Sequence, residues 1–346
     1  MPVLILEGVL LIALIGITIG IIFGRNLLAA TIIYCAFSLT AMLLYTIAGA
    51  ADVAFTEAII GTISTVYFII AIRSIHRSAA DKTEEKKMDE KKNRKKMAIT
   101  LTAIIIITAA SAAKIGSFLP FIGKLDTPAN ANVSAYYISN AVEDTHAHNI
   151  VTAVLADYRG FDTLFETCVL FLSGVAAMTT LSTKKRLPRL HGRDLIEKNK
   201  KSLFGSAIND AAFRIVVPII LIYALYVLFH GEVSLGGGFQ AGALLACAYL
   251  LDRIILTFDM RTRKVREETG LLIGAAGGLL YIMTGIITMI FGGTFLDYDY
   301  LPFNAENPAE LHADGILMIE IGVTVCVAGV IIAILEVVLE RTDFDD

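Results

Sequence analysis

Long runs of apolar residues, separated by short polar stretches, dominate the chain. A bilayer core of about 30 Å requires roughly 20 apolar residues, because each residue of a helix rises 1.5 Å. Such runs occupy residues 3–23, 27–48, 52–72, 97–113, 164–182, 212–230, 239–257, 270–291 and 314–339. We therefore predict an all-α, polytopic integral membrane protein with nine transmembrane helices. Eight helices is the alternative count, since the run at 97–113 is short and Asp52 and Glu57 interrupt the third run.

Lysine and arginine residues are concentrated in alternate connections between these runs. Because cytoplasmic loops retain their positive residues during insertion, this bias sets the orientation. With the N-terminus outside, 26 of the 29 Lys and Arg residues fall on the cytoplasmic side, and the exceptions are Lys114, Lys124 and Arg159. The nine-helix count makes every connection agree with this rule. It places the N-terminus outside and the C-terminus in the cytoplasm.

Two charged stretches divide the chain into three modules. The stretch at 73–96 has the composition of a solvated tether, with a specific partner site as the alternative. The stretch at 184–202 contains Pro188 and Gly192, which break a helix. The predicted modules hold three, two and four helices and span residues 1–96, 97–202 and 203–346.

The long outer connection, residues 114–163, contains a segment with helical periodicity. In IVTAVLADY (150–158), the residues Ile150, Val151, Val154 and Leu155 share one face, which predicts a short helix lying on the outer surface. The sequence has no solenoid period and no inverted pair of similar halves, which disfavours a self-contained two-repeat transporter. We expect the chain to be part of a larger assembly.

Composition excludes several classes of protein. With 56% hydrophobic and 18% charged residues and a mean hydropathy of +0.69, the chain is too apolar for a water-soluble globule. Its net charge of -4 is too small to attract nucleic acid. The first run lacks the basic region of a cleavable signal peptide, so we expect it to be retained as a spanning helix.

The sequence offers no chemistry typical of an enzyme. Each cysteine stands alone in an apolar run without CxxC spacing, so we expect neither a disulfide framework nor a metal cluster. The sequence contains no HExxH or GxSxG motif. We expect a non-catalytic chain without a cofactor.

The third run carries two acids. A carboxylate facing hydrocarbon costs about 2.5–3.5 kcal/mol on insertion scales, so acids within membrane helices often mark an ion route. In residues 52–68, Glu57, Gly61 and Ser64 lie within about 40° of one another on a helix, and Asp52 occupies a neighbouring stripe. One interpretation is an ion-handling face. The alternative is a helix-packing seam, with Glu57 protonated and hydrogen-bonded.

The ninth run contains another deeply placed acid, Glu320, with His312 and Asp314 at its outer mouth. A protonated acid that pairs with another helix is the alternative. Glu336 is expected to be hydrated at the inner end. Under the predicted topology five acids share the outer half of the membrane, which suggests an acidic vestibule: Glu7, Asp52, Glu57, Glu166 and Glu320.

The connection FHGEVSLGGGFQAG (229–242) contains three consecutive glycines, Gly236, Gly237 and Gly238, beside His230 and Glu232. Glycines let the backbone turn tightly and present its amides and carbonyls near the bilayer surface. A plain sharp hairpin is the alternative. The absence of GxxxxGK[ST] argues against a phosphate cradle.

The segment DYRGFDTLFE (157–166) gathers Asp157, Arg159, Asp162 and Glu166 just before the fifth run. An arginine among three acids is typical of an ion-paired clamp, with a catalytic role as the alternative.

Taken together, these segments resemble subunits of the multi-subunit Mrp-type sodium/proton antiporters and of the related membrane-bound hydrogenase and sulfane reductase complexes. DVAFTEAIIGTISTVYFIIAIR (52–73) resembles the D-type component of the hydrogenase complex, which is equivalent to part of the C-terminal extension of Mrp A. VTAVLADYRGFDTLFE (151–166), with its RGFDT signature, is similar to the E-type component. The third module, with HGEVSLGGGFQAG and EIGV (320–323), is similar to the MnhB or Mrp B protein.

The resemblance implies a membrane subunit that helps to exchange sodium for protons within a larger complex in the cell membrane. It implies antiporter subunits, and hydrogenase-like redox subunits, as partners. The ion-path candidates carried over are Asp52, Glu57, Asp162, Glu166 and Glu320. The chain departs from the pattern at Leu235, where the MnhB-type loop usually has proline. It also lacks the long antiporter portion that precedes the D and E segments in Mrp A, which favours a respiratory complex.

A rival hypothesis is a structural subunit that docks and seals the ion-pumping subunits, with its buried acids serving as packing bonds. Convergence of Glu57 and Glu320 on one hydrated cavity would favour ion conduction. Acids isolated from one another would favour scaffolding.

Overall fold

In the computed structural model, the described residues are 2–24, 26–79, 102–103, 106–119, 124, 126–181, 207–255 and 265–343. Every regular element in these ranges is a helix. The chain forms two compact units, one of Met1–Ser74 with Asn140–Asp346 and one of Ile75–Ser139. The predicted tethers lie outside the described residues, except for the end of the third helix at 73–79.

Three helices open the chain, as predicted: α1 (Pro2–Phe23), α2 (Leu27–Ile47) and α3 (Ala51–Ala79). Asn26 begins α2, and its side chain accepts hydrogen bonds from the backbone N–H groups of Leu28 and Ala29, which would otherwise lack helical partners. The turn into α3 places Gly49 at φ +78°, a conformation that glycine adopts without steric cost.

The middle of the chain begins with the helix Ile106–Gly116. It continues through α5 (Pro128–Ala131), α6 (Val133–Thr145), α7 (Ile150–Ala153), the π-helical turn η1 (Val154–Tyr158) and α8 (Gly160–Leu181). Ile106–Gly116 and α5 belong to the smaller unit, and α6 begins there. Part of the predicted fourth run, 97–113, lies outside the described residues.

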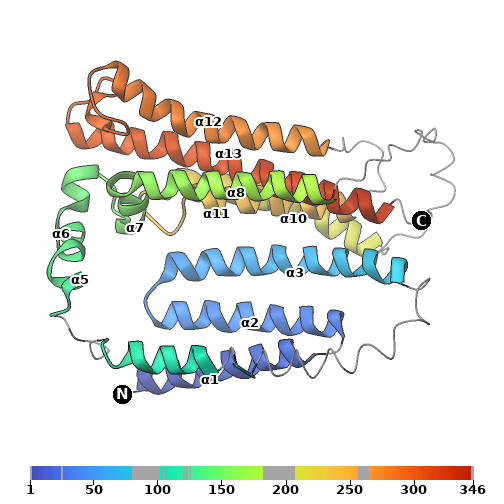
Figure 1. The fold of residues 1–346 in the computed structure, drawn as a ribbon. Coiled ribbons are helices and arrows are strands. Elements are labelled where there is room, and N and C mark those ends of the chain that lie inside the picture. Colours follow the sequence, from blue (N-terminus) through green and yellow to red (C-terminus); the bar gives the residue numbers. More distant parts are fainter. Residues whose placement is uncertain are drawn as a thin grey trace. The chain divides into compact units, whose positions relative to one another are not determined.

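Four helices close the chain: α10 (Ala207–Phe229), α11 (Gly238–Ile255), α12 (Glu267–Ile290) and α13 (Pro308–Asp343). The 3-10 turn η2 (Tyr298–Tyr300) lies before α13. In the larger unit, α13 is the central and most buried helix, and it packs against α8, α10, α11 and α12 (Figure 1).

Glycines allow α12 and α13 to approach closely. A Cβ atom at Gly270 of α12 would lie 3.0 Å from the backbone N of Ala333 in α13. Close backbone packing through small residues is typical of helix pairs in membranes, where lipid supplies no hydrophobic drive for association.

Seven of the helices that the structure describes are long and apolar enough to cross a membrane, so the chain is a multi-pass membrane protein. The other two of the nine predicted runs correspond to α11 and to the helix Ile106–Gly116, which are not among these seven. The count of nine and the orientation of the termini stay predictions.

An acidic cavity where three modules meet

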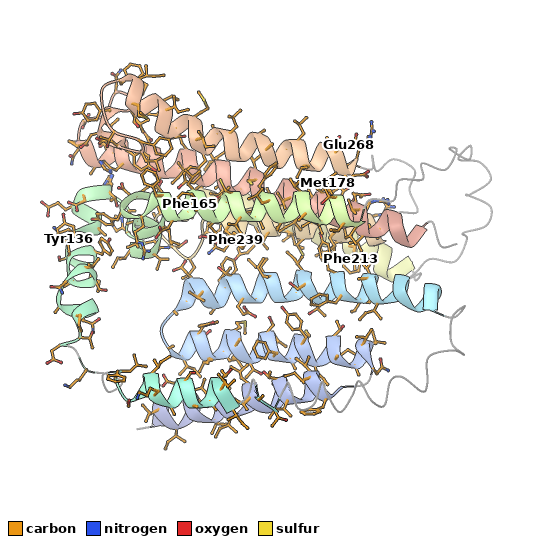
Figure 2. All side chains as sticks on the ribbon, viewed as in Figure 1. Tyr136, Phe165, Met178, Phe213, Phe239 and Glu268 are labelled. Carbon is orange, nitrogen blue, oxygen red and sulfur yellow. The ribbon has the colours of Figure 1, made fainter. Side chains whose placement is uncertain are left out.

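A cavity of about 310 Å³ lies within the larger unit, bordered by α3, α7, η1, α8, α11 and α13. Phe239, at the start of α11, is one of its lining residues and is labelled in Figure 2. We call this space the acidic cavity. Its lining comprises Thr56, Glu57, Ile60, Val151, Thr152, Leu155, Ala156, Thr163, Glu166, Thr167, Leu170, Gly236, Gly237, Gly238, Phe239, Gln240, Ile319, Glu320, Val323 and Val327.

Three of the predicted ion-path acids converge on the acidic cavity. Glu57 comes from α3, Glu166 from α8 and Glu320 from α13, so each predicted module contributes one carboxylate. No lysine, arginine or histidine is among the lining residues that the structure describes. With that lining, the cavity favours a positively charged occupant.

Glu320 is the most deeply buried of the three acids, with 6% of its surface exposed. Among the described residues, its Oε2 atom has no hydrogen-bond partner. Its main-chain carbonyl accepts a hydrogen bond of 2.8 Å from Thr324 Oγ1, and Thr324 also donates to the carbonyl of Gly238 at 3.0 Å. The backbone around Glu320 is therefore fixed while one carboxylate oxygen lacks a donor, which is costly for a buried polar atom.

Glu57 is half-buried and accepts a hydrogen bond from the hydroxyl of Ser38 in α2. Gly61, one turn further along α3, faces the same Ser38 and leaves no room for a Cβ atom. This side of α3 is therefore a packing seam against α2. Glu57 lines the acidic cavity as well, so it lies both at this packing seam and at the candidate functional site.

The triple glycine borders the cavity from the connection between α10 and α11. Gly237 has φ +135°, a conformation that only glycine adopts readily. A Cβ atom there would lie 3.3 Å from Glu320 Oε1 and 3.2 Å from Gln240 Oε1. Gly238 lies against the main chain of Glu320 with no space for a side chain. Gly237 therefore lies beside the Glu320 carboxylate and Gly238 beside its main chain, whereas a Cβ atom at Gly236 would meet the carbonyl of Val227.

The other predicted site residues do not line the cavity. Asp52 accepts hydrogen bonds from the backbone N of Gly236 at 3.3 Å and from Asn149 Nδ2 at 3.4 Å. Asp162 is exposed and forms an ion pair with Arg159, in agreement with the predicted clamp. His230 is exposed and stacks on Tyr226 with a ring separation of 4.2 Å.

Glu232 is half-buried in the same connection. Burial raises the pKa of its carboxyl, the Asp314 carboxylate raises it further, and His146 partly offsets both effects. Glu232 also interacts electrostatically with Glu320. It therefore belongs to the electrostatic surroundings of the cavity although it does not line it.

Several polar residues of the site were not singled out from the sequence. Gln240 Nε2 donates to Thr56 Oγ1 at 2.9 Å, which links α11 to α3 across the cavity lining. Thr152 Oγ1 donates to the carbonyl of Gly231 at 2.8 Å. Asn149 caps α7 through a bond from the backbone N of Val151. A polar side chain directly before an apolar helical run was the available signal for Asn149.

The segment 150–158 is helical, as α7 and the π-helical turn η1, and its position on the outer surface of the membrane stays a prediction. Val151 and Leu155 are substantially exposed, whereas Thr152, Ala153 and Ala156 are buried. Small side chains face inward where η1 packs against α13. Tyr298 donates a hydrogen bond of 2.8 Å to the carbonyl of Ala156.

Polar side chains make further contacts between this segment and α13. The Asp157 carboxylate contacts His312 Nδ1, and His312 Nε2 lies 3.3 Å from Asp299 Oδ1. The π-helical turn thus carries a polar contact to the start of α13. Such turns often occur at functional sites.

Glu336 is not hydrated, contrary to the sequence-based expectation. Its side chain is fully buried. Its Oε1 atom accepts hydrogen bonds from Tyr249 Oη at 2.7 Å and from Arg253 Nε at 2.8 Å. The distant Arg253 supplies the charge that a buried carboxylate requires, and this pairing is a product of tertiary packing.

Three family models match successive parts of the chain. Family models for the D and E subunits of MBH match residues 12–77 and residues 98–196, respectively. A third model, "Domain related to MnhB subunit of Na+/H+ antiporter", matches residues 208–333. One polypeptide thus contains successive regions similar to the D, E and MnhB-related domains.

Individual relatives agree with these matches. The putative antiporter subunit mnhA2 of Staphylococcus aureus is 30% identical over 184 residues, which is 52% of this chain and 21% of the relative. The corresponding protein of Staphylococcus saprophyticus subsp. saprophyticus is 28% identical over 181 residues, with the same coverage. The chain thus spans about a fifth of the length of these curated relatives.

Two solved structures share the fold. A chain of the Mrp complex from Dietzia sp. DQ12-45-1b superposes with a TM-score of 0.70 and 23% identity, covering 95% of this chain and 34% of that one. A chain of the membrane-bound sulfane sulfur reductase, an archaeal respiratory membrane complex, gives a TM-score of 0.53 and 26% identity, covering 70% of this chain and 97% of that one. Both neighbours come from multi-subunit membrane assemblies.

Proposed function

We propose that the chain contributes to the exchange of sodium for protons in the cell membrane, with the acidic cavity as part of the ion path. The observation that carries the proposal is the convergence of Glu57, Glu166 and Glu320 on one cavity whose described lining contains no basic residue. Acids that served only as packing bonds would not have to share a cavity. Glu320, whose Oε2 atom has no hydrogen-bond partner in the part of the chain that the structure describes, is the acid best suited to bind or release a cation.

The chemistry of the lining suits a hard cation. Sodium prefers oxygen ligands, and the cavity offers carboxylates together with the hydroxyl groups of Thr56, Thr152 and Thr163. A proton is accommodated by the same carboxylates. Asp162 lies outside the lining of the acidic cavity, so it would attract cations only through its charge and would not bind them inside the cavity.

The predicted nine-helix topology is part of the proposal. Residues in the first halves of α3, α8 and α11 border the same cavity as residues in the middle of α13, which is consistent with these four helices running in the same direction. They are the third, fifth, seventh and ninth of the predicted spans, which strict alternation requires to be parallel. The family matches, one within each of 1–96, 97–202 and 203–346, support the three predicted modules.

The chain would work within a larger assembly. Its structural neighbours belong to an Mrp complex and to a respiratory sulfane reductase. We propose antiporter subunits as its partners, and redox subunits in a respiratory complex of the hydrogenase type. In that setting this chain would be non-catalytic, and any redox chemistry would take place on its partners.

The test is sodium-dependent proton movement in everted membrane vesicles that contain the intact complex, followed by a pH-sensitive dye after addition of NaCl or choline chloride. Glu57→Gln and Glu320→Gln keep the side-chain volume and remove the charge. Each should lower the sodium-dependent rate by about tenfold or more, which corresponds to roughly 1.4 kcal/mol of lost cation binding. Glu306→Gln, at an exposed position outside the cavity lining, is the matched control. Unchanged rates in both cavity variants would refute ion conduction and favour the scaffold hypothesis.

A further inference from the structure

Asn149 connects three segments that are far apart in the sequence. Its side-chain Nδ2 donates to the carbonyl of Ser234 at 2.9 Å and to the carbonyl of Gly231 at 3.2 Å. The same atom lies 3.4 Å from Asp52 Oδ1. The backbone N of Asn149 donates to the carbonyl of Glu232 at 2.8 Å. Asn149, which directly precedes α7, therefore holds the α10–α11 connection in place. Its side chain donates to two backbone carbonyls of that connection, and its main-chain N–H donates to a third.

Asp52 completes this arrangement from the start of α3. Its Oδ1 atom faces Asn149 and also accepts from the backbone N of Gly236 at 3.3 Å. Thr152 adds a hydrogen bond to the carbonyl of Gly231. The Asp52 oxygen is thus engaged by two N–H donors of the protein, which competes with direct coordination of a cation. We call Asp52, Asn149 and residues 231–236 the loop clamp.

The position of the clamped loop determines the surroundings of Glu320. Gly237 lies directly after the clamp, and a single methyl group on it would lie 3.3 Å from Glu320 Oε1. A methyl group on Gly231 would lie 3.2 Å from Glu320 Oε2. Because the loop backbone lies so close to the carboxylate, a small displacement of the loop changes the space beside that oxygen.

We propose that Asn149 is a positioning residue that holds the glycine loop against Asp52, and that the clamp sets the cation access to Glu320. Asp52 then acts as a hydrogen-bond acceptor of the clamp and not as a cation ligand. The cation part of this inference rests on the proposed function, whereas the clamp itself rests on geometry.

Two variants of Asn149 separate the clamp from the helix cap. Asn149→Asp retains an oxygen that can cap α7 but replaces the Nδ2 donor with a second carboxylate oxygen facing Asp52 and the loop carbonyls. Asn149→Ser is neutral and retains a capping hydroxyl, but it is too short to reach the loop. Asn132→Asp makes the same chemical change at an exposed position and is the control.

Hydrogen–deuterium exchange of residues 231–238 in the intact purified complex measures the clamp without reference to transport. Both Asn149 variants should accelerate exchange of this loop by about tenfold or more, because each loses two or three hydrogen bonds. The sodium concentration that gives half-maximal transport should rise by about tenfold in the same variants. Asn132→Asp should change neither quantity.

Variants of Asp52 test whether it acts as a hydrogen-bond acceptor of the loop clamp or as a cation ligand. Asp52→Asn keeps an oxygen acceptor for Gly236, so loop exchange and sodium dependence should stay within about twofold of wild type, whereas Asp52→Ala should change both. A large loss of sodium affinity in Asp52→Asn with unchanged loop exchange would overturn the inference and return Asp52 to the role of a cation ligand.

The two proposals fail in different ways. Unchanged exchange in both Asn149 variants overturns the clamp. Accelerated exchange with an unchanged half-maximal sodium concentration overturns its role in cation access. A wild-type complex that transports no sodium refutes the proposed function and the cation half of this inference, and the exchange measurements then decide whether Asn149 holds the loop.

Discussion

Replacement of Glu320 by glutamine should make the protein more stable and remove its response to sodium. The carboxylate is 6% exposed, and its Oε2 atom has no hydrogen-bond donor among the described residues. Glutamine has nearly the same shape and no charge. If Glu320 is kept for cation binding, its charge costs stability whenever the site is empty. If it is only a packing bond, its removal costs stability.

The magnitude follows from the cavity. A sphere of the cavity's volume, 310 Å³, is about 8 Å across, and two carboxylates separated by that distance repel each other by about 2 kcal/mol at an effective dielectric constant of 20. Glu232 interacts electrostatically with Glu320, and its partial exposure to solvent weakens this repulsion. Removal of the Glu320 charge should therefore raise the free energy of unfolding by about 1–3 kcal/mol.

Thermal unfolding of the intact complex in nanodiscs, in NaCl or in choline chloride, measures both effects. Each kcal/mol shifts the midpoint by roughly 2–4 °C in chains of 150–250 residues and by less in a longer chain. Sodium at ten times its dissociation constant should stabilise the wild type by about 1.4 kcal/mol. Glu320→Gln should unfold at a higher temperature in choline and gain nothing from sodium, and Glu306→Gln should behave as wild type. A lower midpoint combined with an intact sodium response would refute the reasoning and favour the scaffold hypothesis.

Three further predictions concern stability, measured by the same midpoint. Glu336→Gln removes the buried carboxylate that the partly buried Arg253 contacts, so the free energy of unfolding should fall by about 3–5 kcal/mol; an unchanged midpoint would contradict a structural role for the pair. Folding raises the pKa of Glu232, so its carboxyl contributes to the free energy of unfolding. This contribution is complete below the ordinary pKa of about 4.3 and is lost as the pH rises through the raised pKa. In Glu232→Gln the unfolding midpoint should depend less on pH over that window. A pH dependence equal to that of wild type would count against the raised pKa of Glu232. Gly329→Ala places a methyl group against the backbone of α12 and should lower the midpoint by several degrees, whereas Gly278→Ala meets open space and should change stability by less than about 0.5 kcal/mol; equal effects would contradict the close packing of α12 and α13.

Helix positions could be predicted well from the sequence because hydrocarbon imposes a local rule. Every backbone group in lipid must be satisfied within its own helix, so roughly 20 apolar residues mark a span wherever they occur. α1, α2 and α3 lie where the apolar runs predicted them. The resemblance to Mrp-type subunits was likewise confirmed by matches to three family models.

The acids could be recognised as unusual from the sequence, but their partners could not. Glu57 and Glu320 are both acids within apolar runs, and the same is true of Glu336. Packing brings the first two to one cavity and places the third beside Arg253. A sequence pattern gives the depth of a side chain along its own helix, but not which neighbouring helix it faces.

The sequence by itself determined the helical membrane class, the predicted joints between modules and the residue types available for cation chemistry, since each of these follows from local composition. Only the tertiary structure decided that Asp52 faces the N–H groups of Gly236 and Asn149, while Glu57, Glu166 and Glu320 share a cavity. The physical reason is that the energy of a buried charge depends on the atoms within a few ångströms of it. In this chain those atoms come from segments that lie far apart in the sequence.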